Sequence, residues 1–209
     1  MKKVSLGLFL VLSLVFASVS QAQFLGQVST AVTVTPGGSL VGGYIGVQDE
    51  LLVLFGQYRY GFAKYFGGGV KFGFIDYFDE TGLILGGDLK YQILQDPFTA
   101  PFDLALGGSV EFAATDPVTI LSFGGNVIGS KDFKLRTGRT ISPYGKINIR
   151  AQRVEVDLPP PASGNASDTD LEIGGYFGAD FEVANDFHLL GEFVLEDELG
   201  FVFGVNYSF

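Results

Sequence analysis

Hydrophobic and polar side chains alternate with a period of two through the last eleven residues of the chain, 199–209. Successive side chains of a β-strand point to opposite faces, so this pattern predicts a strand with one strongly apolar face. That face consists of Leu199, Phe201, Phe203, Val205, Tyr207 and Phe209. A strand of this kind needs an apolar neighbour, which is a second sheet in a soluble protein and lipid in a transmembrane barrel.

The same alternation recurs along most of the chain, between short clusters that are typical of turns. Large apolar residues form one face of 82–94, 171–183 and 187–196, and Asp, Glu, Lys or His side chains lie on the other. Ten strands are expected, at 39–47, 51–60, 65–78, 82–94, 102–114, 118–129, 141–156, 171–183, 187–196 and 199–209. The pattern predicts an all-β, antiparallel, up-and-down transmembrane β-barrel. Merging two short segments would give eight strands, and a strand at 27–35 with one further split would give twelve.

Residues 1–22 have the three regions of a secretory signal peptide. Two lysines follow the initial Met, an uncharged apolar run covers 4–17, and small residues stand three and one positions before a cut after Ala22,. The alternative is a single membrane anchor, which needs a longer apolar run of about 20 residues. The expected organisation is a signal peptide at 1–22, a segment 23–38 that is periplasmic or begins the first strand, and a barrel domain at 39–209.

Composition narrows the function classes. Without its two N-terminal lysines the chain carries 11 basic and 23 acidic residues, so its net charge moves from −10 to −12. An acidic surface argues against a nucleic-acid partner, which requires a basic one. The absence of cysteine excludes disulfides and thiolate metal sites,. No cofactor is predicted, because Gly67-Gly68-Gly69 lies inside an expected strand and does not precede a helix.

A soluble lipocalin-like or sandwich protein is the alternative to the membrane barrel. Such a protein buries one face of each strand and wets the other, which should then be dense in charged residues. Here both candidate faces carry many of the 30 glycines and few charges. The abundance of glycine and the 14% aromatic content favour a membrane barrel, where glycine permits bending and aromatics coat the interface,.

The C-terminal Gly-Val-Asn-Tyr-Ser-Phe resembles the closing strand of bacterial outer-membrane β-barrel proteins, whose last residue is very often Phe. Through its strand pattern the resemblance extends over the mature chain. It implies a location in the bacterial outer membrane, contact with outer-membrane lipid, and assembly by periplasmic chaperones and the barrel assembly machinery. Tyr207 and Phe209 would form the assembly signal.

The resemblance also implies an orientation, because the last strand of these proteins ends in the periplasm. The junctions at 61–64, 95–101, 130–139 and 184–186 would then be periplasmic. The connections at 48–50, 79–80, 115–117, 157–170 and 197–198 would face outward. The longest of these, 157–170, is where an extracellular ligand of unknown identity would bind.

Charged side chains fall on the polar strand faces, which line the lumen of a barrel. Opposite charges in a narrow lumen are expected to pair, because an unpaired charge in a dry interior is costly. Two hypotheses follow: a closed barrel with a structural or surface-interaction role, and a narrow channel whose excess of carboxylates favours cations. The candidate lumen charges are Arg59, Lys71, Asp88, Lys90, Asp103, Glu111, Lys146, Arg150, Glu172, Asp180, Glu182, His188, Glu192 and Glu196.

His188 is the only histidine and therefore the one side chain expected to titrate near neutral pH,. Asp186-Phe187-His188 resembles the Asp-x-His pair of omptin proteases, but those barrels are longer and hold the pair near the extracellular mouth. Barrel lipid deacylases use His-x-Ser, and Leu190 stands where the serine is needed. No enzyme is predicted, and His188 is expected to bond a carboxylate such as Glu192.

Two further motifs have alternative interpretations. The basic run at 130–139 is either a solvated turn or a surface for peptidoglycan or anionic headgroups. The sequence Asn165-Ala166-Ser167 matches a glycosylation sequon, which is attributed to chance in an outer loop of a bacterial barrel.

Overall fold

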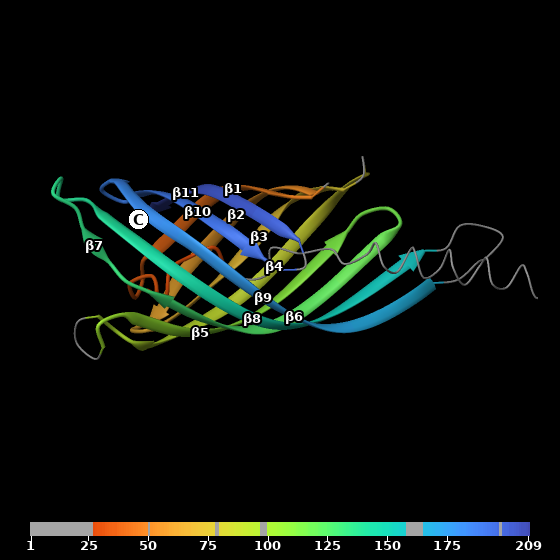
Figure 1. Cartoon of the computed structure of the whole chain (residues 1–209), viewed down its shortest axis with the longest axis horizontal. Helices are drawn as coiled ribbons and strands as arrows, with labels where there is room; N and C mark the ends of the chain where they lie inside the picture. The colour runs from red at the N-terminus through yellow and green to blue at the C-terminus, as the bar shows by residue number, and fades with distance from the viewer. Residues whose placement is uncertain (1–26, 50, 78–79, 97–99, 158–164, 197) are drawn as a thin grey trace, which may run out of the picture.

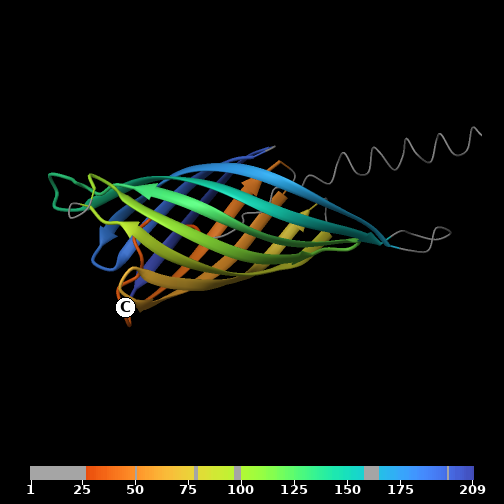
Figure 2. The ribbon, with the colours of Figure 1, turned by 90° about the horizontal axis from the view of Figure 1, so that it is seen from below.

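The computed structural model describes residues 27–49, 51–77, 80–96, 100–157, 165–196 and 198–209. Ten long strands form a closed antiparallel barrel in which each strand pairs with its neighbours in the chain (Figures 1 and 2). The strands are β1 (Ser39–Gln48), β2 (Leu51–Ala63), β3 (Phe66–Tyr77), β4 (Glu80–Leu94), β5 (Asp103–Ala114), β6 (Val118–Ser130), β8 (Thr140–Asp157), β9 (Asn165–Ala184), β10 (Phe187–Leu195) and β11 (Leu199–Ser208). A two-residue strand, β7 (Phe133–Lys134), pairs with the start of β8. The prediction of an all-β barrel of about ten strands is confirmed.

The barrel closes between its first and last strands. β1 and β11 are antiparallel, with Val41 opposite Tyr207 and Val47 opposite Phe201. At the end of this seam the backbones of Ser39 and Phe209 exchange two hydrogen bonds of 2.8 and 2.9 Å. Closure leaves the long strands without an unpaired edge along the barrel wall, which is what an apolar surrounding demands of backbone N–H and C=O groups.

Side chains alternate between the two surfaces of the wall. Along β2, the outward Leu52 and Leu54 are exposed, whereas the inward Val53 and Phe55 are buried. On β8 the outward Ile147 is 62% exposed. Leu, Ile, Val and Phe side chains dominate the outer surface around the barrel, so we assign the chain as a transmembrane β-barrel,. Among the described residues, no helix is long and apolar enough to span a membrane.

The strand boundaries differ from the expected ones mainly in the hairpin of β8 and β9. The loop predicted at 157–170 is too long, because residues 165–170 belong to β9 and pair with β8, with Asp157 opposite Asn165. Backbone pairing sustains this part of the hairpin although residues 165–170 include no large apolar side chain. Residues 158–164 lie outside the described part, and Asn165-Ala166-Ser167 is in a strand.

Residues 27–38 run before β1 and have an irregular backbone, so 27–35 is not a strand. Val28 and Ala31 are completely or almost completely buried, and the segment bonds to side chains that point into the lumen. Residues 27–31 therefore lie inside the barrel, which neither sequence-based alternative, a periplasmic segment or a first strand, predicts, and we refer to 27–35 as the inserted segment. Hydrogen bonds to wall side chains satisfy this backbone in place of a strand ladder. The expected signal peptide and cleavage site lie outside the described residues.

We predict that Gly204→Val destabilises the barrel whereas Gly43→Val does not. A Cβ at Gly204 would collide with the ring of Tyr44 inside the lumen, whereas a Cβ at Gly43 on the outer surface meets no atom within 4 Å. Overpacking of this kind costs about 2 kcal/mol. Urea unfolding of the detergent-folded variants, monitored by heat-modifiable gel migration, measures the difference in their free energies of unfolding. Equal stability of the two variants would contradict it.

Candidate functional site: the barrel lumen

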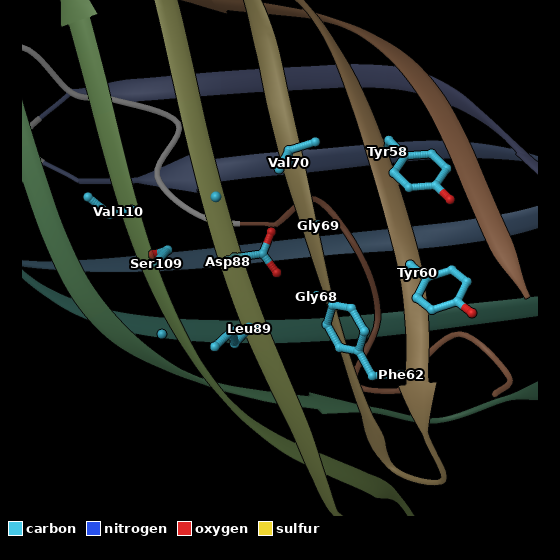
Figure 3. Close-up of a pocket in the computed structure, with 12 residues that line it drawn as sticks. Tyr58, Tyr60, Phe62, Gly68, Gly69, Val70, Asp88, Leu89, Ser109 and Val110 are labelled. Atoms are coloured by element: carbon cyan, nitrogen blue, oxygen red, sulfur yellow. The ribbon is translucent and has the colours of Figure 1, made fainter. Parts of the chain in front are cut away.

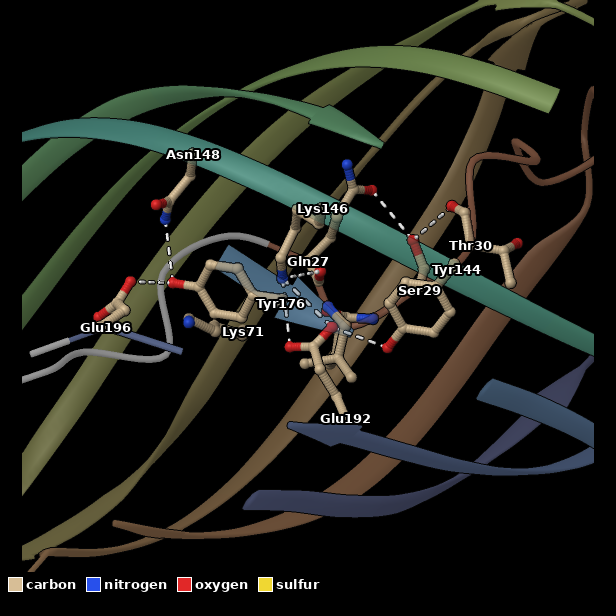
Figure 4. A network of polar contacts seen from close by, with 12 residues as sticks. Gln27, Ser29, Thr30, Lys71, Tyr144, Lys146, Asn148, Tyr176, Glu192 and Glu196 are labelled. Carbon is tan, nitrogen blue, oxygen red and sulfur yellow. Dashed lines mark hydrogen bonds and ion pairs between the residues drawn. The ribbon is translucent and has the colours of Figure 1, made fainter. Parts of the chain in front are cut away.

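The guanidinium of Arg150 is the centre of a polar cluster between β8, β9 and the end of β10. Its Nη1 donates to both carboxylate oxygens of Glu196, at 2.7 and 2.8 Å, and its Nη2 contacts the carboxylate of Glu172. The Tyr176 hydroxyl donates to the same Glu196 carboxylate and accepts a 3.0 Å hydrogen bond from Asn148 Nδ2 (Figure 4). Arg150 is 1% exposed, so these partners replace water around its charge,.

A second cluster lies further along the same strands, around Lys146 and Glu192. Lys146 Nζ lies 3.2 and 3.3 Å from the carboxylate oxygens of Glu192, and the Tyr144 hydroxyl donates to that carboxylate at 2.7 Å. Lys146 Nζ also lies 3.9 Å from the centroid of the Tyr176 ring, within cation–π range,. The side chain of Tyr176 thus joins this cluster to Glu196 and Asn148 of the first one (Figure 4).

Two more ion pairs belong to the wall formed by β2 to β5. Arg59 and Asp88 form a bidentate pair, with N–O distances of 2.9 and 2.7 Å. Lys71 is paired with Glu111, and its ammonium lies 5.4 Å from the ring centroid of Phe55. All four charged side chains are nearly inaccessible to solvent. Removing one partner of such a pair would leave a buried, uncompensated charge.

Lys90 is bound by the inserted segment. Its Nζ donates to Ser29 Oγ at 3.0 Å, to the carbonyl oxygen of Thr30 at 2.8 Å and to that of Val32 at 2.8 Å. An ammonium has three donors, so the segment alone supplies an acceptor for each of them. Lys90 is 2% exposed. The buried charge and the irregular backbone therefore stabilise each other, because each satisfies polar groups of the other.

Other wall side chains fix the segment along its length. It is bonded to inward residues of β2, β4, β6 and β8, which are strands on different parts of the wall. The bonds run from Val28 N to Gln57 Oε1 at 3.4 Å, from Ala31 N to Ser130 Oγ at 3.1 Å, from Thr33 N to Gln92 Oε1 at 3.3 Å and from Lys146 Nζ to the Gln27 carbonyl at 3.2 Å. The segment consequently connects wall strands across the lumen near the end where the chain enters β1.

The remaining candidate charges lie toward that same end. Asp103 accepts hydrogen bonds from Gln92 Nε2 at 2.8 Å and from the backbone N–H of Asp96 at 3.1 Å. Glu182 accepts one from the backbone N–H of Thr140 at 3.0 Å. His188 Nδ1 lies 2.6 Å from Asp180 Oδ1 on β9.

The expected partner of His188 was wrong. Glu192, four residues further along β10, lies on the same inward face but is bonded to Lys146 and Tyr144. Because a strand rises about 3.3 Å per residue, positions four apart are too distant to bond, whereas Asp180 is on the adjacent strand. Among the described residues, no group of three His, Asp or Glu side chains is placed to hold a metal ion.

The lumen also contains neutral polar side chains that are absent from the predicted set of lumen charges. Three buried tyrosines, Tyr44, Tyr144 and Tyr176, bridge the ionic clusters or stack inside the lumen, with the Tyr44 and Phe55 ring centroids 4.9 Å apart. Their inward positions follow from the same alternation, so the period-two pattern could have found them. In residues 27–35 the same alternation, with Val28, Val32 and Val34 on one face, predicts a strand in place of the irregular backbone. Tyr207 and Phe209 point outward and are exposed at the barrel rim.

No family model matches the chain, and no curated protein does. Among solved structures, the chain is similar to the N-terminal β-barrel domain of Pseudomonas aeruginosa OprF, at 10% identity, 84% coverage of this chain, 100% of that one and a TM-score of 0.41. It is also similar to the KdgM porin, at 12% identity and a TM-score of 0.40, and the match covers 81% of this chain and 99% of the porin. A third similar structure is that of Ail, the attachment invasion locus protein of Yersinia pestis. The identity is 14%, the match covers 84% of this chain and 100% of Ail, and the TM-score is 0.34. At these values no residue role is transferred.

We predict that Arg150→Met destabilises the folded barrel by about 3–5 kcal/mol, because it leaves the buried carboxylate of Glu196 and the partly exposed carboxylate of Glu172 without their cation,. Arg153→Met is the matched control. Arg153 bonds Glu155 at 2.7 Å on the same strand, but its side chain is 56% exposed, and such pairs contribute about 1 kcal/mol or less,. Urea unfolding in detergent measures the free energy of unfolding of both variants. Similar losses of stability in the two would contradict the central role of Arg150 in the cluster.

We predict that Lys90→Met releases the inserted segment. The natural chain has no cysteine, so Ala31→Cys provides a single thiol at a fully buried position. A water-soluble maleimide should label this thiol slowly in the parent barrel and faster when Lys90 is also replaced. Thr137→Cys, in an exposed turn, is the control for reactivity and should label quickly in both backgrounds. Unchanged labelling of the Ala31 thiol would contradict the role of Lys90.

Proposed function

We propose that this chain is an integral protein of the bacterial outer membrane with a closed lumen and a structural or surface-interaction role. Its signal peptide, 1–22, would be removed after Ala22. Periplasmic chaperones and the barrel assembly machinery would insert it, with Tyr207 and Phe209 as the assembly signal. Both side chains are exposed on the outer surface, where another protein can reach them.

The observation that carries a closed lumen is the burial of its charges. Arg150, Lys146, Glu111 and Lys90 are each at most 2% exposed. A water-filled channel would hydrate such groups, as it does in wide barrels. Here carboxylates, tyrosine hydroxyls and the backbone of the inserted segment occupy the space around them. The cluster around Lys146 contacts the segment, and the cluster around Arg150 obstructs the lumen further along β8.

The alternative function is a narrow, weakly cation-preferring channel. Eight of the candidate lumen charges are carboxylates and five are Lys or Arg. Asp103, Asp180 and Glu182 are bonded to amide, histidine and backbone donors and lie toward one mouth. A ring of carboxylates at a pore mouth attracts cations. This function requires that the inserted segment leave the lumen.

The long hairpin of β8 and β9 supports a surface-interaction role. Its strands, of 18 and 20 residues, are the longest of the barrel and extend beyond β10 at the end away from the barrel termini (Figure 1). In the proposed orientation this end faces the exterior. An extracellular ligand would bind there. We assign no catalytic role to the chain, and His188 is a wall residue bonded to Asp180.

Planar-bilayer recordings test the closed lumen. We expect no conductance steps from the parent protein over many insertions, with incorporation verified by heat-modifiable migration of the recovered protein. Deletion of 27–35 separates the two obstructions, because continued silence would assign closure to the ionic clusters and new steps would assign it to the segment. A stable ohmic step with cation selectivity from the parent protein would replace this proposal by the channel.

A further inference from the structure

A hollow of about 770 Å³ lies on the outer surface of the barrel across β2 to β5. Tyr58, Tyr60 and Phe62 from β2 form one side, and Leu89 and Val110 lie on the other (Figure 3). All five side chains are more than a third exposed. The hollow thus opens onto the surface that faces lipid.

Glycines create the hollow. Across the four strands, one row of outward positions reads Tyr58, Val70, Gly87, Val110, and the next reads Tyr60, Gly68, Leu89, Gly108. A Cβ at Gly87 or Gly108 would meet its nearest atom at 3.7 or 3.8 Å, an ordinary contact. The wall therefore tolerates side chains at these two positions. Their absence leaves space between the surrounding aromatic and aliphatic groups.

The hollow has a polar end and an apolar end. At the barrel rim, the Tyr58 hydroxyl is hydrogen-bonded to Ser39 Oγ at 2.9 Å. The turn of the β2–β3 hairpin, two residues after Phe62, carries Lys64, whose Nζ lies 4.8 Å from the ring centroid of Tyr65. Away from the rim the lining becomes aliphatic, with Val70 and Val110. Tyrosines at this level are typical of the membrane interface.

The apolar end continues into a second hollow of about 720 Å³. The two hollows share Tyr58 and Val70, and Gly43 and Gly56 lie in the floor of the second one. Gly43 and Gly56 face each other on β1 and β2. Together the hollows form a groove that begins at the interface and runs toward the middle of the barrel wall, as an extended hydrocarbon chain does in a membrane.

We propose that this groove binds one acyl chain of a phospholipid, with the headgroup at the level of Lys64. The occupant follows from continuity, because the groove is part of the lipid-facing surface and has an interfacial end and an apolar end. The single lysine on this hairpin turn favours an anionic headgroup. The proposal rests on the membrane location given above, and it does not depend on whether the lumen is closed.

Native mass spectrometry of the full-length folded barrel tests this site. The protein is released from nanodiscs that contain equal parts of phosphatidylethanolamine and phosphatidylglycerol, and the retained lipid is identified by mass. We expect one retained phospholipid, enriched in phosphatidylglycerol. Gly87→Leu with Gly108→Leu fills the groove and should lower retention roughly tenfold, since about ten carbon–carbon contacts are lost.

Two variants serve as controls. Gly145→Leu adds the same side chain at an outward glycine on β8, where a Cβ has its nearest neighbour at 3.8 Å, and it should retain lipid as the parent does. Lys64→Gln should abolish the preference for phosphatidylglycerol while a phospholipid is still retained. Equal loss in the Gly145 variant, or none in the groove variant, would overturn the proposal.

Two further outcomes of the mass spectrometry also test the proposed lipid site. Absence of any retained lipid from the parent protein would overturn the site. A dimer that dissociates when the groove is filled would assign the groove to a second copy of the chain. Neither outcome affects the membrane location, which is measured separately by cell fractionation: recovery of the protein in a soluble fraction would overturn the proposed function itself.

Discussion

Backbone hydrogen bonding in an apolar surrounding is the constraint on which the rest of this structure depends. Lipid offers no partner to an N–H or C=O group, so the strands must pair on both sides. The seam between β1 and β11 meets that requirement, and the bonds between Ser39 and Phe209 complete it at the rim. Once the ring is closed, alternation divides every strand into a lipid side and a lumen side.

A ring of ten strands encloses a narrow interior, which leaves little room for water around the polar groups of the lumen. Charges placed there lose water and need partners of opposite sign or fixed dipoles. Four pairs provide the first solution: Arg59 with Asp88, Lys71 with Glu111, Lys146 with Glu192, and Arg150 with Glu196. Lys90 is stabilised by fixed dipoles instead, because carbonyl and hydroxyl oxygens of the inserted segment surround its ammonium.

Much of the fold could be predicted because lipid and lumen impose opposite polarities on neighbouring residues. The presence of ten strands and the inward direction of residues such as Arg150 and Glu192 follow from that periodicity, whereas the first six residues of β9, 165–170, do not. Which charges pair does not follow, because the partner depends on register between strands. His188 illustrates this, since its partner Asp180 is selected by the pairing of β9 with β10, not by its spacing along the chain.

The inserted segment was beyond prediction for a different reason. Residues 27–35 are small and polar, and their backbone is held by side chains from β2, β4, β6 and β8, which are distant in sequence. The alternation of Val28, Val32 and Val34 favours a strand here, but the backbone is irregular because its partners are side chains. Its structure is determined by wall side chains that accept from its N–H groups and by the ammonium groups of Lys90 and Lys146, which donate to its carbonyl oxygens.

Glycine placement links the two surfaces of the wall. On the inner surface, a Cβ at Gly204 would collide with Tyr44 and one at Gly178 with Tyr144, so these glycines make room for rings that fill the lumen. On the outer surface, Gly87 and Gly108 have room for a side chain but carry none. The first group is required by packing within the chain. The second is not, so the reason for the hollow must be sought in what lies against the barrel.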